Sequence, residues 1–144
     1  MEIQYTNHIS VEEYGEVRHS VGWQEIPARQ TERGLKNSLF ITCARDGEKA
    51  VGLLRVLGDG GYTAVIADVM VRPEYQGRGI GKQLVQNAIK YIKGSLEPGD
   101  KILVYLMAAK GRETFYKQFG FLERPNEDYG AGMTQWFFDE EEGA

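Results

Sequence analysis

The sequence lacks the features that form disulfides, span a membrane or direct secretion. Cys43 is its only cysteine, so no internal disulfide can form and stability does not require an oxidising compartment. No apolar run approaches the roughly 20 residues that span a bilayer. The N-terminus also lacks the basic flank and apolar stretch of a signal peptide. We therefore expect a cytoplasmic protein without a membrane partner.

Basic charge and metal-ligand patterns are scarce as well. Lys and Arg number 17 against 21 Asp and Glu, which gives a net charge of −4. Nucleic-acid binders normally carry a basic surplus, so we expect no nucleic-acid partner. The two histidines and one cysteine form no cluster with metal-ligand spacing, so we expect no metal.

Repeats, low-complexity tracts and Pro/Ser-rich linkers are absent too. A chain of 144 residues fits one compact domain, residues 1–144, with a real core. Only residues 139–144 are strongly biased, and this acidic segment is expected to be a solvated, frayed tail.

The first half of the chain carries helix signals and then strand signals. Ser10 and Glu13 have the spacing of a capping box, which predicts a helix to about Val21. Pro27 predicts a loop over 23–29, before a short helix at 31–37. Apolar, β-rich runs at 39–44, 51–57 and 62–71 are separated by Asp46-Gly47 and by the turn 58–61. Three strands joined by tight turns favour an antiparallel meander.

The second half begins with a change of period. Apolar residues recur at helical spacing and predict an amphipathic helix that ends at Gly94; they are Ile80, Leu84, Val85, Ala88, Ile89 and Ile92. The strand predicted at 101–106 should pair in parallel with 62–71, because a helix connects the two. A helix is expected at 112–119, stopped by Gly120, and two last strands at 121–123 and 133–138. The fold class is α+β, with a mixed sheet flanked by helices.

A glycine turn, Gln76-Gly77-Arg78-Gly79-Ile80-Gly81, lies between a predicted strand and a predicted helix. The start of a helix has unpaired N–H groups and a partial positive charge, and glycines let phosphate oxygens approach the backbone. The dinucleotide fingerprint fails because position 82 is lysine, and the Walker pattern fails because Gln83 follows Lys82.

The turn fits the pattern [Gln/Arg]-x-x-Gly-x-[Gly/Ala], and Phe115-Tyr116 with Gly120-Phe121 follows at a suitable distance. In both motifs the chain resembles the GNAT superfamily of acetyl-CoA-dependent N-acetyltransferases. The resemblance implies a mostly antiparallel central sheet with splayed parallel strands at the cofactor site. Within the superfamily, the chain is similar in particular to a small subgroup that includes plastid serotonin N-acetyltransferases and glucosamine-6-phosphate N-acetyltransferases. The matches to the subgroup are Val51-Gly52, Arg55, Asp59, Asp68-Val69, Phe115-Tyr116 and Gly132-Met133.

The resemblance implies that acetyl-CoA is the cosubstrate. The strand before the turn would contact the pantetheine arm through its backbone, and the turn would hold the pyrophosphate. The implied cofactor-binding residues are Val69, Met70, Val71, Gln76, Gly77, Arg78, Gly79, Ile80, Gly81 and Lys82. Many family members have an asparagine where this chain has Ala109, so Lys110 or Arg112 could compensate.

Tyr116 matches the family tyrosine that protonates the departing thiolate of coenzyme A. Three carboxylates are candidates for a general base, Asp68, Glu25 and Asp128, and the sequence does not choose among them. Cys43 lies in an apolar strand, so we interpret it as a core residue rather than an acyl-carrying nucleophile. Direct attack of the amine on acetyl-CoA is therefore the expected mechanism.

The family fold implies that the acceptor enters between residues 21–25 and 129–136. Aromatic and acidic side chains there suit a small cationic, partly apolar amine, and the candidate acceptor-binding residues are Trp23, Glu25, Asp68 and Tyr129. Three functions remain open: a small-molecule amine acetyltransferase, a protein lysine or N-terminal acetyltransferase, and a non-catalytic acetyl-CoA sensor. The family commonly forms dimers, so a homodimer is possible.

Overall fold

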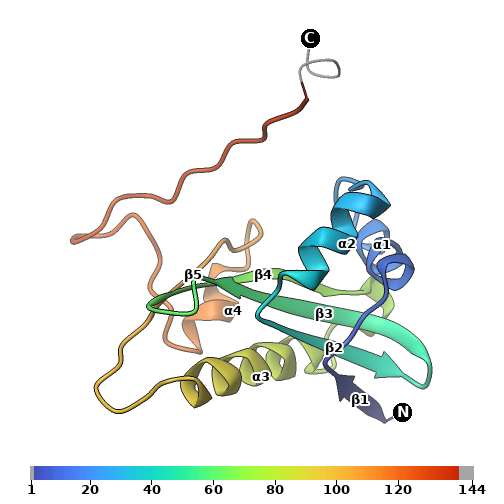
Figure 1. Ribbon diagram of the computed structural model, residues 1–144, viewed down its shortest axis with the longest axis horizontal. Coiled ribbons are helices and arrows are strands. Elements are labelled where there is room, and N and C mark those ends of the chain that lie inside the picture. The colour runs from blue at the N-terminus through green and yellow to red at the C-terminus, as the bar shows by residue number, and fades with distance from the viewer. Residues whose placement is uncertain (1, 140–144) are drawn as a thin grey trace. The chain divides into compact units, whose positions relative to one another are not determined.

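The computed structural model describes residues 2–139, which contain a five-stranded sheet with helices on both of its faces (Figure 1). Helices α1 and α2 lie on one face of the sheet and α3 lies on the other. The chain divides into two compact units after Leu106. The first unit contains the whole sheet, and the second contains one short helix.

The first helix begins as its sequence predicts. Helix α1 spans Val11–Ser20, and Ser10 and Glu13 form the complete capping box: Glu13 N donates to Ser10 Oγ (3.1 Å) and Ser10 N donates to Glu13 Oε1 (3.0 Å). Helix α2 spans Ala28–Lys36 and therefore begins three residues before the predicted start. Pro27 lies at its N-cap with φ −51°, so the proline starts this helix instead of extending the loop.

The sheet has the order β1-β2-β3-β4-β5. Strands β2 (Phe40–Asp46), β3 (Lys49–Gly58) and β4 (Thr63–Val71) form the predicted antiparallel meander, and β5 (Leu103–Leu106) pairs in parallel with β4. Strand β1 (Ile3–Thr6), antiparallel to β2, was missed. Its four residues are too few to show an alternating pattern, so pairing with β2 must define it.

The core lies on both faces of β3, whose residues 50–54 are all buried. Helix α3 (Ile80–Gly94) buries Ile80, Leu84, Val85, Ala88 and Ile92, the face that its helical period predicts. On the other face Tyr14 and Val17 of α1 belong to one cluster with Leu53 and Met70. Cys43 is fully buried, as expected of a core residue, and burial raises the pKa of its thiol to about 11.

Close packing leaves no room for a side chain at Gly52 in β3. A Cβ on Gly52 would lie 2.8 Å from the carbonyl oxygen of Met70, which is part of the β4 backbone and cannot move aside. No helix within residues 2–139 is long and apolar enough to cross a membrane. The cytoplasmic location stays a prediction.

The second unit differs most from its predicted elements. Helix α4 spans only Glu113–Lys117, because Phe119 N and Gly120 N donate to the carbonyls three residues earlier and tighten the chain into turns. The strands predicted at 121–123 and 133–138 are wrong, since residues 107–139 contain no strand. Apolar residues form a strand only where a neighbouring strand pairs with them and their side chains are partly buried. Here Met133 is 89% exposed and Phe137 is 82% exposed. Apart from Asp139, the predicted frayed tail lies outside the described residues.

Candidate active site

The glycine turn joins β4 to α3 through a short 3-10 helix, η1 (Pro73–Tyr75). Gly77 and Gly79 adopt left-handed φ values of 79° and 81°. A Cβ built on either glycine meets nothing within 4 Å, so glycine is required there by the backbone conformation and not by crowding. The space beside both residues is open to a ligand.

The start of α3 exposes unpaired backbone donors. Gly79 is the N-cap and offers no side chain to cap the helix, and the first α-helical bond runs from Gln83 N to Gly79 O (3.1 Å). The N–H groups of Ile80, Gly81 and Lys82 therefore have no hydrogen-bond partner among residues 2–139. Three N–H groups at the positive end of a 15-residue helix are suited to bind an anion.

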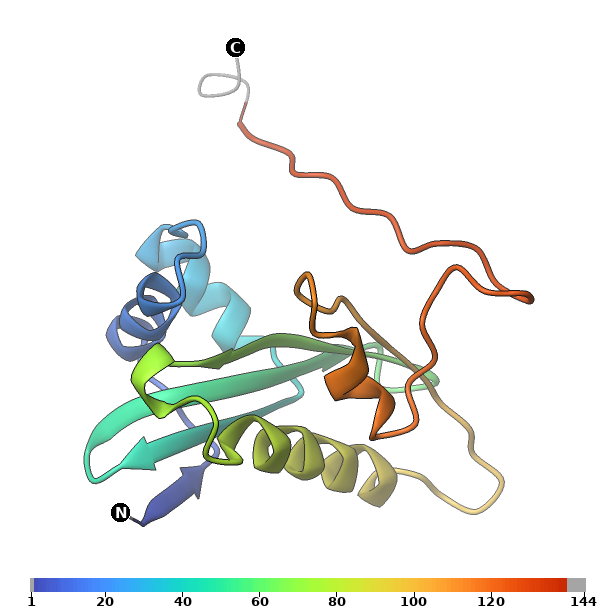
Figure 2. The same cartoon turned by 180° about the vertical axis from the view of Figure 1, so that it is seen from behind.

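The loop between β4 and α3 lies at the end of the sheet where the β2–β3 hairpin turns (Figure 2), and a hydrogen bond of Tyr75 joins the two. Its hydroxyl donates to Asp46 Oδ2, and its ring carries Lys49 Nζ at 5.7 Å and the Arg78 guanidinium at 5.1 Å. Gln76 closes the turn from inside, because its side chain donates to Val71 O (2.9 Å) and its N–H to Pro73 O (3.2 Å). The turn is thus formed without a ligand, and the two hydrogen bonds of Gln76 stabilise it.

The edge of β4 next to the turn is open. Pairing of β4 with β5 ends at Ile66 and Leu106, whereas β4 continues to Val71. Arg72 N donates to Val51 O (2.8 Å), and backbone groups alternate along a strand, so Val71 N points away from β3 toward this open edge. This is the splay that the family resemblance implies, and it leaves backbone donors for an extended ligand such as a pantetheine arm.

Asp68 lies at a β-bulge where the β3–β4 register shifts, and it has a left-handed φ of 56°. Its carboxylate is 13% exposed and accepts hydrogen bonds from Arg55 Nε (2.6 Å) and Tyr14 Oη (2.9 Å), with Arg18 Nη1 at 3.8 Å. Burial, followed by the charge of Asp68, raises the pKa of Tyr14 to about 12. A carboxylate with two bonds and two nearby guanidiniums is poorly suited to remove a proton from an amine, so the geometry disfavours Asp68 as the general base.

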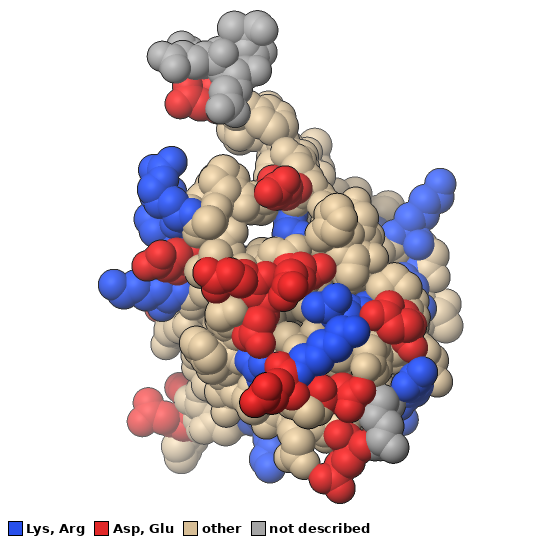
Figure 3. All heavy atoms as spheres, turned by 90° about the vertical axis from the view of Figure 1, so that its right-hand side faces the viewer, with Lys and Arg blue, Asp and Glu red and all other residues tan. Residues whose placement is uncertain are grey.

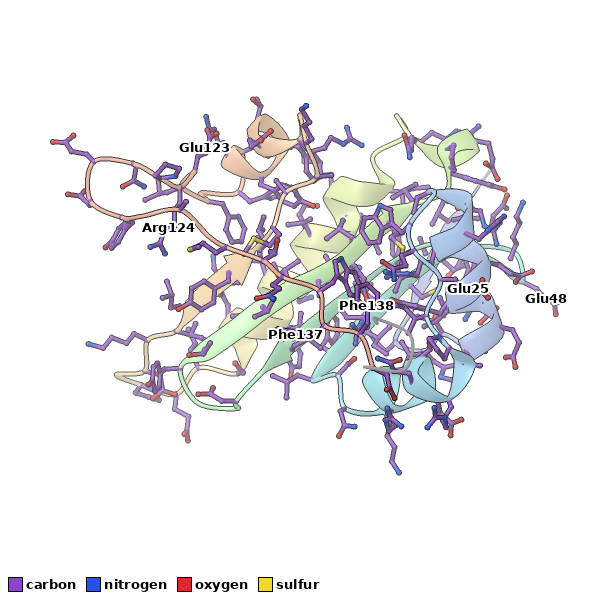
Figure 4. The ribbon with its side chains drawn as sticks, turned by 90° about the horizontal axis from the view of Figure 1, so that it is seen from above. Glu25, Glu48, Glu123, Arg124, Phe137 and Phe138 are labelled. Atoms are coloured by element: carbon purple, nitrogen blue, oxygen red, sulfur yellow. The ribbon has the colours of Figure 1, made fainter. Side chains whose placement is uncertain are left out.

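The other candidate residues of the first unit lie on the segment between α1 and α2. Trp23 is 38% exposed, and Glu25 is exposed on the same segment (Figure 4). The sequence did not indicate that Arg18 would be buried beside them. Its guanidinium lies 5.5 Å from the Trp23 ring centroid, and only the fold brings it to Asp68, 50 residues away in the chain. No local pattern could have revealed this contact.

In the second unit, Tyr116 is buried on α4 within an aromatic cluster. Its ring makes edge contacts with Phe115 (5.0 Å between centroids) and Phe121 (6.5 Å). Burial raises the pKa of the Tyr116 phenol, which therefore keeps its proton at neutral pH and can donate it.

The remaining candidates of this unit lie on exposed loops. Tyr129 is 56% exposed and has the Arg124 guanidinium 5.0 Å from its ring centroid. Asp128 N donates to Asn126 Oδ1 in the same loop. Arg112 N donates to Ala109 O (2.9 Å), and the Lys110 and Arg112 side chains point into solvent as exposed cations.

Surface charge is mixed. On the face that Figure 3 shows, Lys and Arg side chains lie among Asp and Glu side chains, and no separate basic field forms. Residues 2–139 contain no group of three His, Cys, Asp or Glu side chains that could hold a metal ion.

Known proteins are similar to this chain in sequence and in fold. Residues 4–121 match the model of the Acetyltransferase (GNAT) family. Over 123 residues the chain is 32% identical to the uncharacterized N-acetyltransferase ycf52 of Pyropia yezoensis. The aligned region covers 83% of this chain and 68% of that protein. A crystal structure from meticillin-resistant Staphylococcus aureus, described as a probable acetyltransferase, superposes with a TM-score of 0.83 at 29% identity and covers 94% of this chain and 100% of that one. The chloroplastic serotonin N-acetyltransferase 2 of Oryza sativa subsp. japonica is 26% identical over 115 residues, 77% of this chain and 56% of that protein.

Proposed function

The chain belongs to the GNAT family of acetyltransferases, and we propose that it transfers the acetyl group of acetyl-CoA directly to the primary amine of a small molecule. The observation that carries the proposal is the set of unpaired N–H groups of Ile80, Gly81 and Lys82, which follow a left-handed glycine turn. Enzymes of this family normally use acetyl-CoA.

The first unit fits the anionic and extended parts of that cosubstrate. Donors at the start of α3 suit the pyrophosphate, and the Lys82 side chain adds positive charge in the first helical turn. The open edge of β4 at Val69 and Val71 suits the amide groups of the pantetheine arm. Both regions are formed by the fold before any ligand binds, which reduces the entropy lost on binding.

The reaction itself needs few groups. The neutral amine nitrogen attacks the thioester carbonyl carbon, and the new C–N bond forms as the C–S bond breaks. The nitrogen releases one proton to solvent water. In our proposal Tyr116 gives its phenolic proton to the departing sulfur, because its raised pKa keeps the hydroxyl protonated. The Tyr116 phenolate takes a proton back from solvent after turnover. Asp68 takes no part in the proton transfer, since its carboxylate is occupied by Arg55, Tyr14 and Arg18.

The acceptor is proposed to lie along the segment after α1, where Trp23 offers partly exposed aromatic surface and Glu25 an exposed carboxylate. Tyr129 is proposed as a further contact. The name of the rice relative supports a small aromatic amine as one class of acceptor.

The test is release of free thiol from acetyl-CoA in the presence of a panel of amines, which includes 2-phenylethylamine, propylamine, glucosamine 6-phosphate and a lysine-containing peptide. We expect turnover of at least one small amine, and none by Tyr116→Phe above about 1% of the wild-type rate. Turnover of the peptide alone would replace the small-molecule acceptor with a protein. Cofactor binding without turnover of any amine would instead indicate a sensor.

A further inference from the structure

A network of charged side chains connects the β4 bulge to the segment that follows α1. Asp68 lies at its centre and contacts Tyr14 and Arg18 from α1 and Arg55 from β3. All four side chains belong to the first unit and are buried or nearly so. Because one carboxylate faces two guanidiniums, the network has one positive charge in excess.

The two arginines have different outer contacts. Arg55 Nη1 donates to Gly34 O and Ser38 Oγ, both at 3.1 Å, and thereby fixes the end of α2. Arg18 instead reaches the segment after α1. Its Nε donates to Gln24 O, its Nη1 donates to Tyr14 Oη (3.0 Å), and its guanidinium lies over the Trp23 ring at 5.5 Å.

Residues 23–26 have few other constraints. Trp23 N donates to Arg18 O (3.3 Å), and among the described residues no hydrogen bond links the backbone N–H of Gln24, Glu25 or Ile26 to another group. A segment with so few backbone hydrogen bonds would adopt several conformations without side-chain contacts to the rest of the unit. The Arg18 side chain therefore supplies the contacts that place Trp23 and Gln24 relative to the bulge.

We propose that Arg18 is a positioning residue that sets the acceptor preference of the enzyme through Trp23. This inference rests on the proposed function, which places the acceptor along this segment. A guanidinium already covers part of the Trp23 ring, so the ring attracts a second cation less strongly. The open part of the indole then receives the uncharged portion of the acceptor, while the amino group lies elsewhere.

The variant that tests this role is Arg18→Lys. Lysine keeps the charge near Asp68, but its single nitrogen cannot take the places of both Nε and Nη1, and it has no planar group to stack on Trp23. We expect the KM for 2-phenylethylamine to rise about tenfold and the KM for propylamine to change less than about threefold, since only the former has a ring to place on the indole. The KM for acetyl-CoA and the thermal shift that CoA produces should stay within about twofold of wild type. Arg33→Lys, an exposed arginine on α2, is the matched control and should leave all of these values unchanged.

A second variant keeps the test valid if Arg18→Lys fails to fold. Trp23→Leu removes the exposed ring and leaves the Asp68 network intact, and it should reproduce the loss of preference for 2-phenylethylamine. In the double variant the increases in the KM for 2-phenylethylamine should not add, because both substitutions remove the contact between the acceptor and the Trp23 ring.

The outcomes separate the two proposals. An active wild type whose amine preference does not change in either single variant would overturn the role of Arg18 and leave the proposed function standing. Equal increases in the KM for amine and for acetyl-CoA would also overturn it, because that pattern indicates general damage. A wild type that binds CoA but releases no thiol with any amine would overturn the proposed function, and the role of Arg18 with it.

Discussion

The two units of this chain reach their structures in different ways. In residues 2–106, contacts between distant segments define the fold: Glu13 pairs with Arg45, Asp68 with Arg55, and Tyr75 with Asp46. In residues 107–138 the hydrogen bonds join residues at most six positions apart, and Tyr116 is the one buried side chain described there. The first unit therefore holds the proposed cofactor site rigidly, and the second supplies the proposed proton donor from a short local helix.

The largest expected effect is on kcat and comes from a substitution in the second unit, which tests whether that unit takes part in the chemistry. Tyr116→Phe keeps the aromatic ring and removes only the hydroxyl, so kcat should fall about 100-fold or more because the thiolate loses its proton donor. Stopped-flow or thiol-release assays measure kcat, and calorimetry with CoA should show unchanged affinity. Phe115→Leu, next to it on α4, is the control for loss of packing. A kcat within threefold of wild type for Tyr116→Phe would remove the second unit from the chemistry.

The next effect lies in the first unit and concerns stability. Asp68→Asn removes the negative charge between two guanidiniums, and asparagine tolerates the left-handed backbone, so the change is electrostatic. We expect the free energy of unfolding to fall by about 3 kcal/mol. Urea unfolding measures it. If stability were unchanged and kcat fell strongly instead, Asp68 would be the base after all.

A matched pair of glycines tests whether the turn binds a ligand. Gly79 and Gly60 have similar left-handed φ values, 81° and 76°, and a Cβ on either would meet nothing within 4 Å. Alanine should therefore cost each position about 1 kcal/mol of stability. Only Gly79→Ala should raise the KM for acetyl-CoA, by about tenfold, because it shifts the donors at the start of α3. Equal KM values in the two variants would show that the turn is structural.

The smallest effect is a pH dependence in the first unit. Hydrogen bonds from Arg45, at 2.7 and 3.0 Å, lower the pKa of Glu13 from 4.5 to about 2. A lowered pKa stabilises the fold above pH 4.5, and this stabilisation is lost as the pH falls toward 2. Glu13→Gln keeps a capping side chain, so it should cost about 1 kcal/mol at pH 7. Thermal unfolding across pH should show that difference disappear in acid, and a constant difference would contradict the account.

The sequence predicted best those features that depend on local or periodic signals. The capping box at Ser10, the apolar face of α3 and the glycine turn all follow from residues a few positions apart, and each is found where expected. The parallel pairing of β5 followed from the connecting helix. Strand β1 and the Asp68 network could not be predicted, because each depends on partners dozens of residues away. The strands expected at 121–123 and 133–138 failed for the same reason, since apolar side chains do not specify a ladder partner.

The central claim is that the start of α3 holds the pyrophosphate of acetyl-CoA, and amide resonances test it most directly. CoA added to ¹⁵N-labelled protein should shift the backbone amide signals of Gly77, Gly79, Ile80, Gly81 and Lys82 most strongly, because their N–H groups would gain phosphate partners. The amides of Gly60 and Gly61, in the turn between β3 and β4, provide the internal reference. Saturating CoA that leaves the amides from Gly77 to Lys82 unchanged would contradict the account.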